Sequence, residues 1–87
     1  MEPNTFTGYV TKFALSIGVI EVTLKETGTP RMVEHVGLAY LTYYHGNDWW
    51  RTRDEAVRRA EVMRDAKLLS LRGSIARLEA LNFGIAP

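Results

Sequence analysis

The stretch Thr52–Leu81 constrains the fold most, because it contains no proline and opens with the signals of a helix N-terminus. Glu55 follows Thr52 at the spacing of a capping box, in which each side chain bonds the other residue's backbone amide. At the far end, Gly84 is the predicted left-handed stop, with Asn82 as the alternative. We therefore expect one long helix over this stretch.

Apolar side chains fall on two separate faces of this helix when each residue is turned by about 100°. One face, which we name the large-residue stripe, contains Ala56, Val57, Ala60, Met63, Leu68, Leu71, Ile75, Leu78 and Leu81. The other face, which we name the small-residue stripe, contains Val62, Ala66, Leu69, Gly73, Ala76 and Ala80.

A helix that lies on one sheet needs only one apolar face. The second stripe therefore indicates a second packing partner. We expect the large-residue stripe to cover the chain's own sheet. Small residues let two helix backbones approach closely, so we expect the small-residue stripe to contact the helix of a second copy. Ala76→Glu or Gly73→Glu would then give monomers. The alternative interpretation is that alanine and glycine are tolerated on a solvated face.

The length of the predicted helix also favours association. About thirty helical residues span about 45 Å, whereas a compact domain of this size has a radius of gyration of about 12 Å. The helix must therefore project beyond its domain and meet a partner, or break near Gly73 with Ser74 capping a second helix. The large-residue stripe keeps its phase through Gly73, which favours one continuous helix.

The residues before the helix are rich in β-branched and aromatic types, divided by turn signals. Phe6 is out of phase with the alternation that follows, so we expect a bulge or a late strand start near Gly8. A tight turn is expected at residues 16–18. The pattern predicts strands at residues 9–15, 19–25, 31–36 and 38–44.

The predicted fold is therefore α+β, with a three- or four-stranded antiparallel sheet followed by one long C-terminal amphipathic helix, or by a helical pair broken near Gly73. Residues 1–87 form a single domain with a β-rich part at 5–45 and a helical part at 52–82. A core of this size is marginal alone, and the chain has no cysteine to cross-link it. Association into a homodimer would supply the missing burial.

The sequence contains no catalytic constellation, phosphate loop or metal-ligand spacing. We therefore predict a non-enzymatic interaction or structural module without cofactor or metal. It also contains no leader pattern and no apolar run long enough to cross a membrane, so a cytoplasmic protein without membrane contact is expected.

An alternative function is suggested by the distribution of charge. The net charge is +1, but residues 51–87 carry eight basic and five acidic side chains. A nucleic-acid-binding accessory protein would use Arg51, Arg53 and Arg58, with Tyr44 and Trp49 as exposed aromatic residues for stacking bases. Acidic residues share the helix face of Arg58, and a small domain needs aromatic residues in its core. We therefore favour self-association.

Two segments resemble sequences of small uncharacterised bacterial and phage-borne proteins. The first is the run Tyr9–Val22, and the second is Asn47–Ala56 with its continuation into the leucine-rich helix. The resemblance covers more than half of the chain and implies no catalytic residue, because the group has no known activity. It implies a mobile-element or prophage setting, in which a host protein is a second candidate partner.

Overall fold

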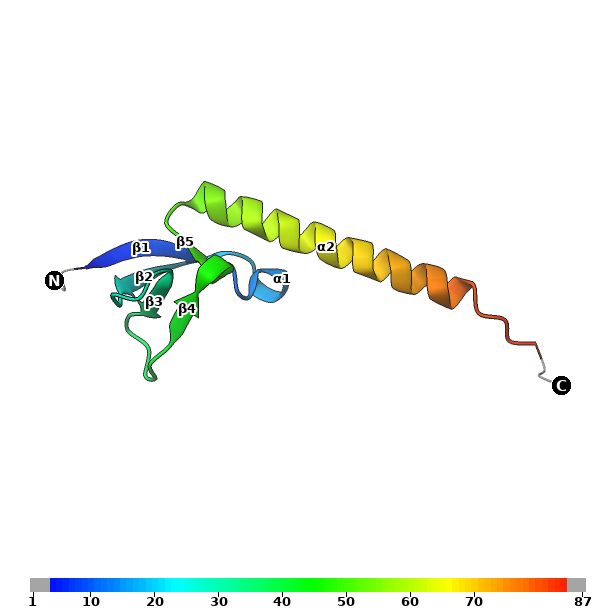
Figure 1. Cartoon of the computed structure of the whole chain (residues 1–87), viewed down its shortest axis with the longest axis horizontal. Coiled ribbons are helices and arrows are strands. Elements are labelled where there is room, and N and C mark those ends of the chain that lie inside the picture. Colours follow the sequence, from blue (N-terminus) through cyan, green and yellow to red (C-terminus); the bar gives the residue numbers. More distant parts are fainter. Residues whose placement is uncertain (1–3, 85–87) are drawn as a thin grey trace.

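The computed structural model describes residues 4–84 and places a small antiparallel sheet at one end of a long helix (Figure 1). The strands pair in the order β4-β3-β2-β1-β5, and every neighbouring pair is antiparallel. In chain order the elements are β1 (Thr5–Val10), α1 (Ala14–Ile17), β2 (Ile20–Glu26), β3 (Met32–His35), β4 (Tyr43–His45), the 3-10 turn η1 (Gly46–Asp48), β5 (Trp49–Trp50) and α2 (Arg53–Glu79).

This arrangement confirms the predicted α+β fold with one long C-terminal helix, although the sheet has five strands rather than three or four. The additional strand is β5, which pairs with β1 through Tyr9–Trp50 and Val10–Trp49. β5 contains only two residues, too few for an alternating pattern to reveal in the sequence. It matters because it places the start of α2 beside β1.

The core lies on one face of this sheet. Its buried residues come from all five strands, and Phe6, Ile20 and Val22 pack around them. The Tyr44 hydroxyl lies 2.8 Å from Nδ1 of His35, and burial raises the pKa of Tyr44. The buried cluster consists of Val10, Leu24, Val33, Tyr44 and Trp49.

Gly8 lies within β1 and is required by close packing. A Cβ atom at this position would lie 2.3 Å from Cδ1 of Leu24 and 3.3 Å from the Trp50 carbonyl oxygen. A hydrogen atom in place of a side chain lets Leu24 fill the centre of the core. The predicted bulge or late start at Gly8 is therefore wrong, because β1 pairs with β2 continuously from Thr5.

The predicted strand at 9–15 is also wrong beyond Val10, since the chain turns there and forms the short helix α1. Thr11 explains the end of the strand. Its hydroxyl donates to the Asn47 carbonyl at 2.8 Å, and its amide donates to the Asp48 carbonyl at 2.8 Å. These bonds to η1 come from a distant part of the chain, so the local alternation could not show them.

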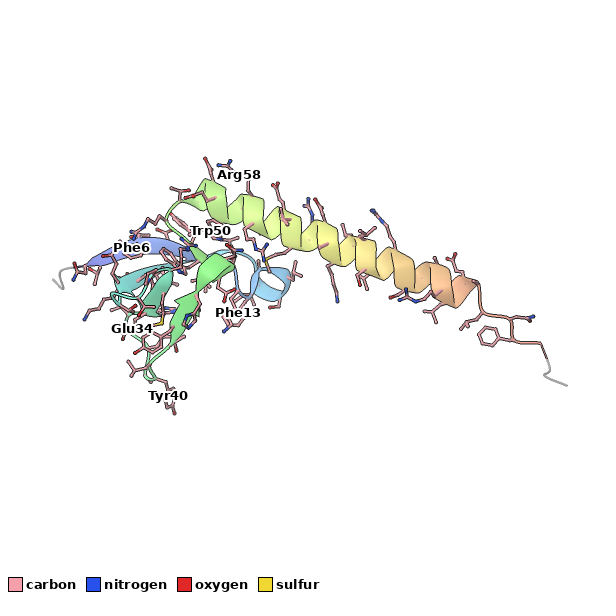
Figure 2. The ribbon with its side chains drawn as sticks, viewed as in Figure 1. Phe6, Phe13, Glu34, Tyr40, Trp50 and Arg58 are labelled. Carbon is pink, nitrogen blue, oxygen red and sulfur yellow. The ribbon has the colours of Figure 1, made fainter. Side chains whose placement is uncertain are left out.

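The predicted strand at 38–44 is largely wrong, because only Tyr43 and Tyr44 of that range belong to β4. The β3–β4 reversal begins at Gly37, whose φ of 92° is left-handed. The His35 amide donates to the Thr42 carbonyl at 2.8 Å, which makes the intervening residues a loop. Tyr40 extends into solvent from this loop (Figure 2). The strands predicted at 19–25 and 31–36 are confirmed as β2 and β3.

The predicted cap at the start of α2 is confirmed. The Thr52 hydroxyl oxygen accepts from the Glu55 amide at 3.2 Å, and the hydroxyl donates to the Glu55 carboxylate at 2.8 Å. The reciprocal contact therefore joins the two side chains, where the sequence predicted a bond from Glu55 to the Thr52 amide. The observed cap satisfies one backbone donor of the first turn, the Glu55 amide, where the predicted capping box would satisfy two.

Thr52→Ala is expected to lower the free energy of unfolding by about 1 kcal/mol, because it removes the acceptor of the Glu55 amide. Urea denaturation followed by circular dichroism measures this loss. Thr52→Ser keeps the hydroxyl and should retain most of the stability. An equal loss in both variants would show that the cap does not stabilise the helix.

α2 is one continuous helix through Gly73, as the phase of the large-residue stripe indicated. It ends earlier than predicted, at Glu79, and Ala80 follows in a right-handed conformation. Neither Asn82 nor Gly84 has a positive φ, so the predicted left-handed stop is wrong. The Gly84 amide instead donates to the Asn82 side chain at 2.9 Å.

Candidate functional site: the free half of the C-terminal helix

Among residues 4–84, α2 packs against its own domain near the N-terminal end of the helix. Ala56 is buried, and Val57, Ala60 and Met63 are half-buried. These residues belong to the large-residue stripe, and α2 makes its main contacts with α1, β1 and β5. The first part of the stripe therefore packs against the domain, as predicted, but it lies at the sheet's β1–β5 edge.

The remainder of α2 projects beyond the domain (Figure 1). From Arg64 to Gly84 every residue is exposed except Gly73 and Ser74, which are half-buried. The radius of gyration is 19.1 Å and the longest dimension is 72 Å. A compact chain of this length would have a radius of gyration of about 12 Å. We name residues 64–80 the free segment.

Both stripes are uncovered along the free segment, which corrects the expectation that the large-residue stripe lies on the sheet. Leu71, Ile75 and Leu78 expose 45%, 53% and 65% of their surface. On the small-residue stripe, Leu69 is exposed, as are Ala66, Ala76 and Ala80, and so is Val62 just before the free segment. The sheet did not need the distal leucines because its core closes with the aromatic residues of β4 and β5.

A further apolar surface lies beside α2 and was missed in the sequence. Leu15 and Ile17 are exposed on α1, which packs against α2. A hollow of about 430 Å³ lies between the two helices, lined by Ala14, Leu15, Val19, Val57, Ala60, Glu61 and Arg64. The sequence predicted a strand up to Leu15 and a tight turn at residues 16–18, so the pattern hid this short helix.

The residues predicted to contact nucleic acid do not form one surface. Tyr44 and Trp49 are each only 3% exposed, so the expected exposed aromatic residues are in the core. Trp49 is held there by Arg31, whose guanidinium lies 4.4 Å from the ring centroid and whose carbonyl accepts from the indole Nε1 at 3.0 Å. Neither ring can stack on a base.

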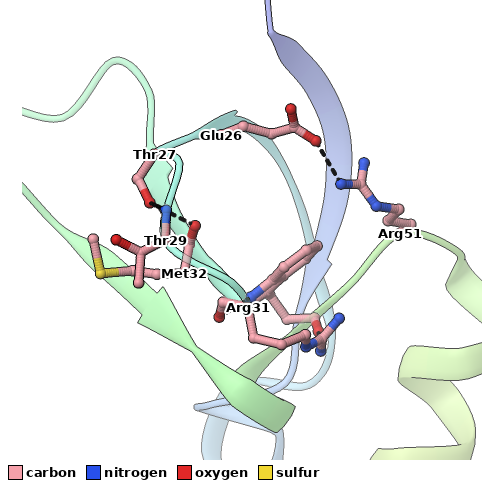
Figure 3. Close-up of polar contacts among 7 residues, drawn as sticks. Glu26, Thr27, Thr29, Arg31, Met32 and Arg51 are labelled. Atoms are coloured by element: carbon pink, nitrogen blue, oxygen red, sulfur yellow. Dashed lines mark hydrogen bonds and ion pairs between the residues drawn. The ribbon is translucent and has the colours of Figure 1, made fainter.

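The arginines of this predicted site are separated and partly engaged. Arg51 donates to the Glu26 carboxylate at 2.7 Å (Figure 3), and its guanidinium lies 4.3 Å from the Phe6 ring centroid. Arg53 and Arg58 are exposed on α2, and Arg58 donates to the Asp54 carbonyl at 3.4 Å. A surface that tracks phosphates needs clustered cations without acidic neighbours. The structure shows no such cluster at these three positions.

The described residues can also be compared with what a ligand pocket, a metal site and a membrane span would require. A hollow of about 360 Å³ beside Arg31 and Arg51 is formed by the β2–β3 loop, but both guanidinium groups already stack on core aromatic rings. Within residues 4–84, no three His, Cys, Asp or Glu side chains come together as metal ligands would. In the same part of the chain, no helix has the length and apolar character needed to span a bilayer.

No protein-family model, curated protein or solved structure matches this chain. The resemblance to small phage-borne proteins gains no support from these comparisons. The free segment is the most pronounced feature of the described structure that could contact a partner.

Proposed function

We propose that this chain is a small non-enzymatic interaction module of the cytoplasm that forms a homodimer through the free segment of α2. The observation that carries the proposal is the exposure of both apolar stripes from Arg64 onward. Most of the stability of a protein helix comes from the packing of its apolar face, and the free segment has no such packing in a single chain. A partner that covers the segment would stabilise it as a helix.

The magnitude of the exposed apolar surface supports this proposal. Burying a leucine or isoleucine fully is worth about 1.5–3 kcal/mol, and the stripe residues Leu68, Leu71, Ile75 and Leu78 each bury only part of their surface in one chain. Covering the rest would contribute on the order of 1 kcal/mol for each residue. Two copies would double this gain and offset the entropy lost on association.

Light scattering after size exclusion tests the proposal directly. At tens of micromolar we expect a mass near twice the 9.9 kDa of one chain, with a shift toward one chain on dilution. The same run is repeated with a short single-stranded oligonucleotide at low salt. A single-chain mass at every concentration would contradict the proposal, and comigration with the oligonucleotide would favour the nucleic-acid alternative instead.

A further inference from the structure

The large-residue stripe is the stronger candidate for the dimer contact, although the sequence favoured the small-residue stripe. The sequence pattern assigned the leucines of the large-residue stripe to the chain's own sheet. In the structure the leucines from Leu68 onward are free. Hydrophobic stabilisation grows with the apolar area removed from water, and leucine and isoleucine offer more of it than alanine and glycine.

The position of the domain decides the direction of pairing. The domain packs on the large-residue stripe at Ala56, Val57, Ala60 and Met63, so it lies on the same side of α2 as the exposed leucines. Two helices paired in parallel through this stripe would bring both domains to the same place. In an antiparallel pair each domain lies beyond the end of the other helix, so the two domains do not collide.

The spacing of the exposed residues sets the register. Leu68, Leu71, Ile75 and Leu78 are separated by three, four and three residues, a pattern that reads the same in both directions. A two-fold axis near Gly73 places Leu68 opposite Leu78 of the second copy and Leu71 opposite Ile75. This axis is also close to the midpoint of the free segment, so the overlap uses its whole length. All four layers then contain two large residues.

Leu81, which follows the end of α2, adds a further contact between the two copies at this register. Leu81 of one copy reaches the level of residue 65 of the other, where the hollow between α1 and α2 opens. Leu81 is exposed in the single chain, as are Leu15 and Ile17 beside the hollow. We infer that two copies pair antiparallel along the large-residue stripe, with Leu81 of each copy in the α1–α2 hollow of the other. This inference rests on the proposed self-association.

The charges that flank this seam make a further prediction about salt. The register places Arg72 beside Arg72 of the second copy, and Asp65 beside Glu79. These like-charged pairs are exposed, so they oppose pairing weakly and are screened by salt. Dimerisation is therefore expected to strengthen between low and moderate salt, whereas binding to nucleic acid would weaken.

Disulfide cross-linking tests the register, because the chain contains no cysteine. Leu68→Cys and Leu78→Cys are prepared separately, mixed and oxidised. We expect a covalent dimer in the mixture, joining tryptic peptide 68–72 to peptide 78–87, and little from either variant alone. Two copies of residue 68 would lie ten residues apart along the axis, about 15 Å, beyond the reach of about 7 Å for a disulfide.

Ala66→Cys and Ala76→Cys form the matched control, with the same ten-residue spacing on the small-residue stripe. If the Ala66→Cys and Ala76→Cys mixture cross-links and the Leu68→Cys and Leu78→Cys mixture does not, the inferred contact surface is wrong. If Leu68→Cys cross-links without Leu78→Cys, the inferred antiparallel register is wrong. In both cases self-association itself would remain. A mixture of Leu15→Cys and Leu81→Cys is expected to cross-link as well, and its failure would overturn the placement of Leu81. A single-chain mass of the unmodified protein would instead contradict the proposed function itself.

Discussion

Leu71→Glu is expected to convert the dimer into a monomer, with a dissociation constant raised at least about 100-fold. Leu71 is half exposed in the single chain, so the change leaves the domain intact. In the dimer it places two carboxylates in the seam, each opposite Ile75 of the other copy. Removing an unpaired carboxylate from water costs several kcal/mol. Sedimentation equilibrium of the variant and the unmodified protein measures the difference.

Ala76→Glu is the matched control for this variant, because it introduces the same charge one residue from Ile75 but on the other stripe. We expect it to change the dissociation constant by less than about tenfold, since an exposed carboxylate contributes little. The reverse result, with Ala76→Glu monomeric and Leu71→Glu dimeric, would place the contact on the small-residue stripe as the sequence first indicated.

Leu24→Ala is expected to lower the free energy of unfolding by about 2–5 kcal/mol, because Leu24 is fully buried at the centre of the sheet. The loss is a large part of the stability available to a domain of this size. Urea denaturation followed by tryptophan fluorescence measures it, since Trp49 is part of the same core. The measurement is made in the Leu71→Glu background, so that dissociation does not contribute.

Leu69→Ala serves as the control for core packing, because Leu69 is exposed on α2. Its expected effect in the monomeric background is within about 0.5 kcal/mol. A loss below about 1 kcal/mol for Leu24→Ala would show that the core does not depend on this residue. The close approach of Leu24 to Gly8 argues against that result.

Local signals in the sequence predicted the local features of the fold. The Thr52–Glu55 cap, the continuous helix through Gly73 and the strands β2 and β3 follow from spacing and residue type alone. What the sequence misplaced depends on distant contacts. β1 stops because Thr11 bonds to η1, and the reversal at Gly37 uses residues with strand-like composition as a loop.

The candidate site was only partly predictable for the same reason. Periodicity identified two apolar stripes on α2, but it could not show how far the domain would reach along them. That limit is set by β5 and α1, whose short sequences carry little pattern. The burial of Tyr44 and Trp49 was equally hidden, because either face of a strand rich in aromatic residues can become the core.

Hydrogen exchange along α2 tests the central claim, that a second copy covers the free segment. An unsupported helical end exchanges its amides rapidly. We predict that at tens of micromolar the amides of residues 66–79 are protected as strongly as those at the start of α2, and that this protection falls on dilution. Rapid exchange in residues 66–79 at every concentration, with residues 56–63 still protected, would contradict the account.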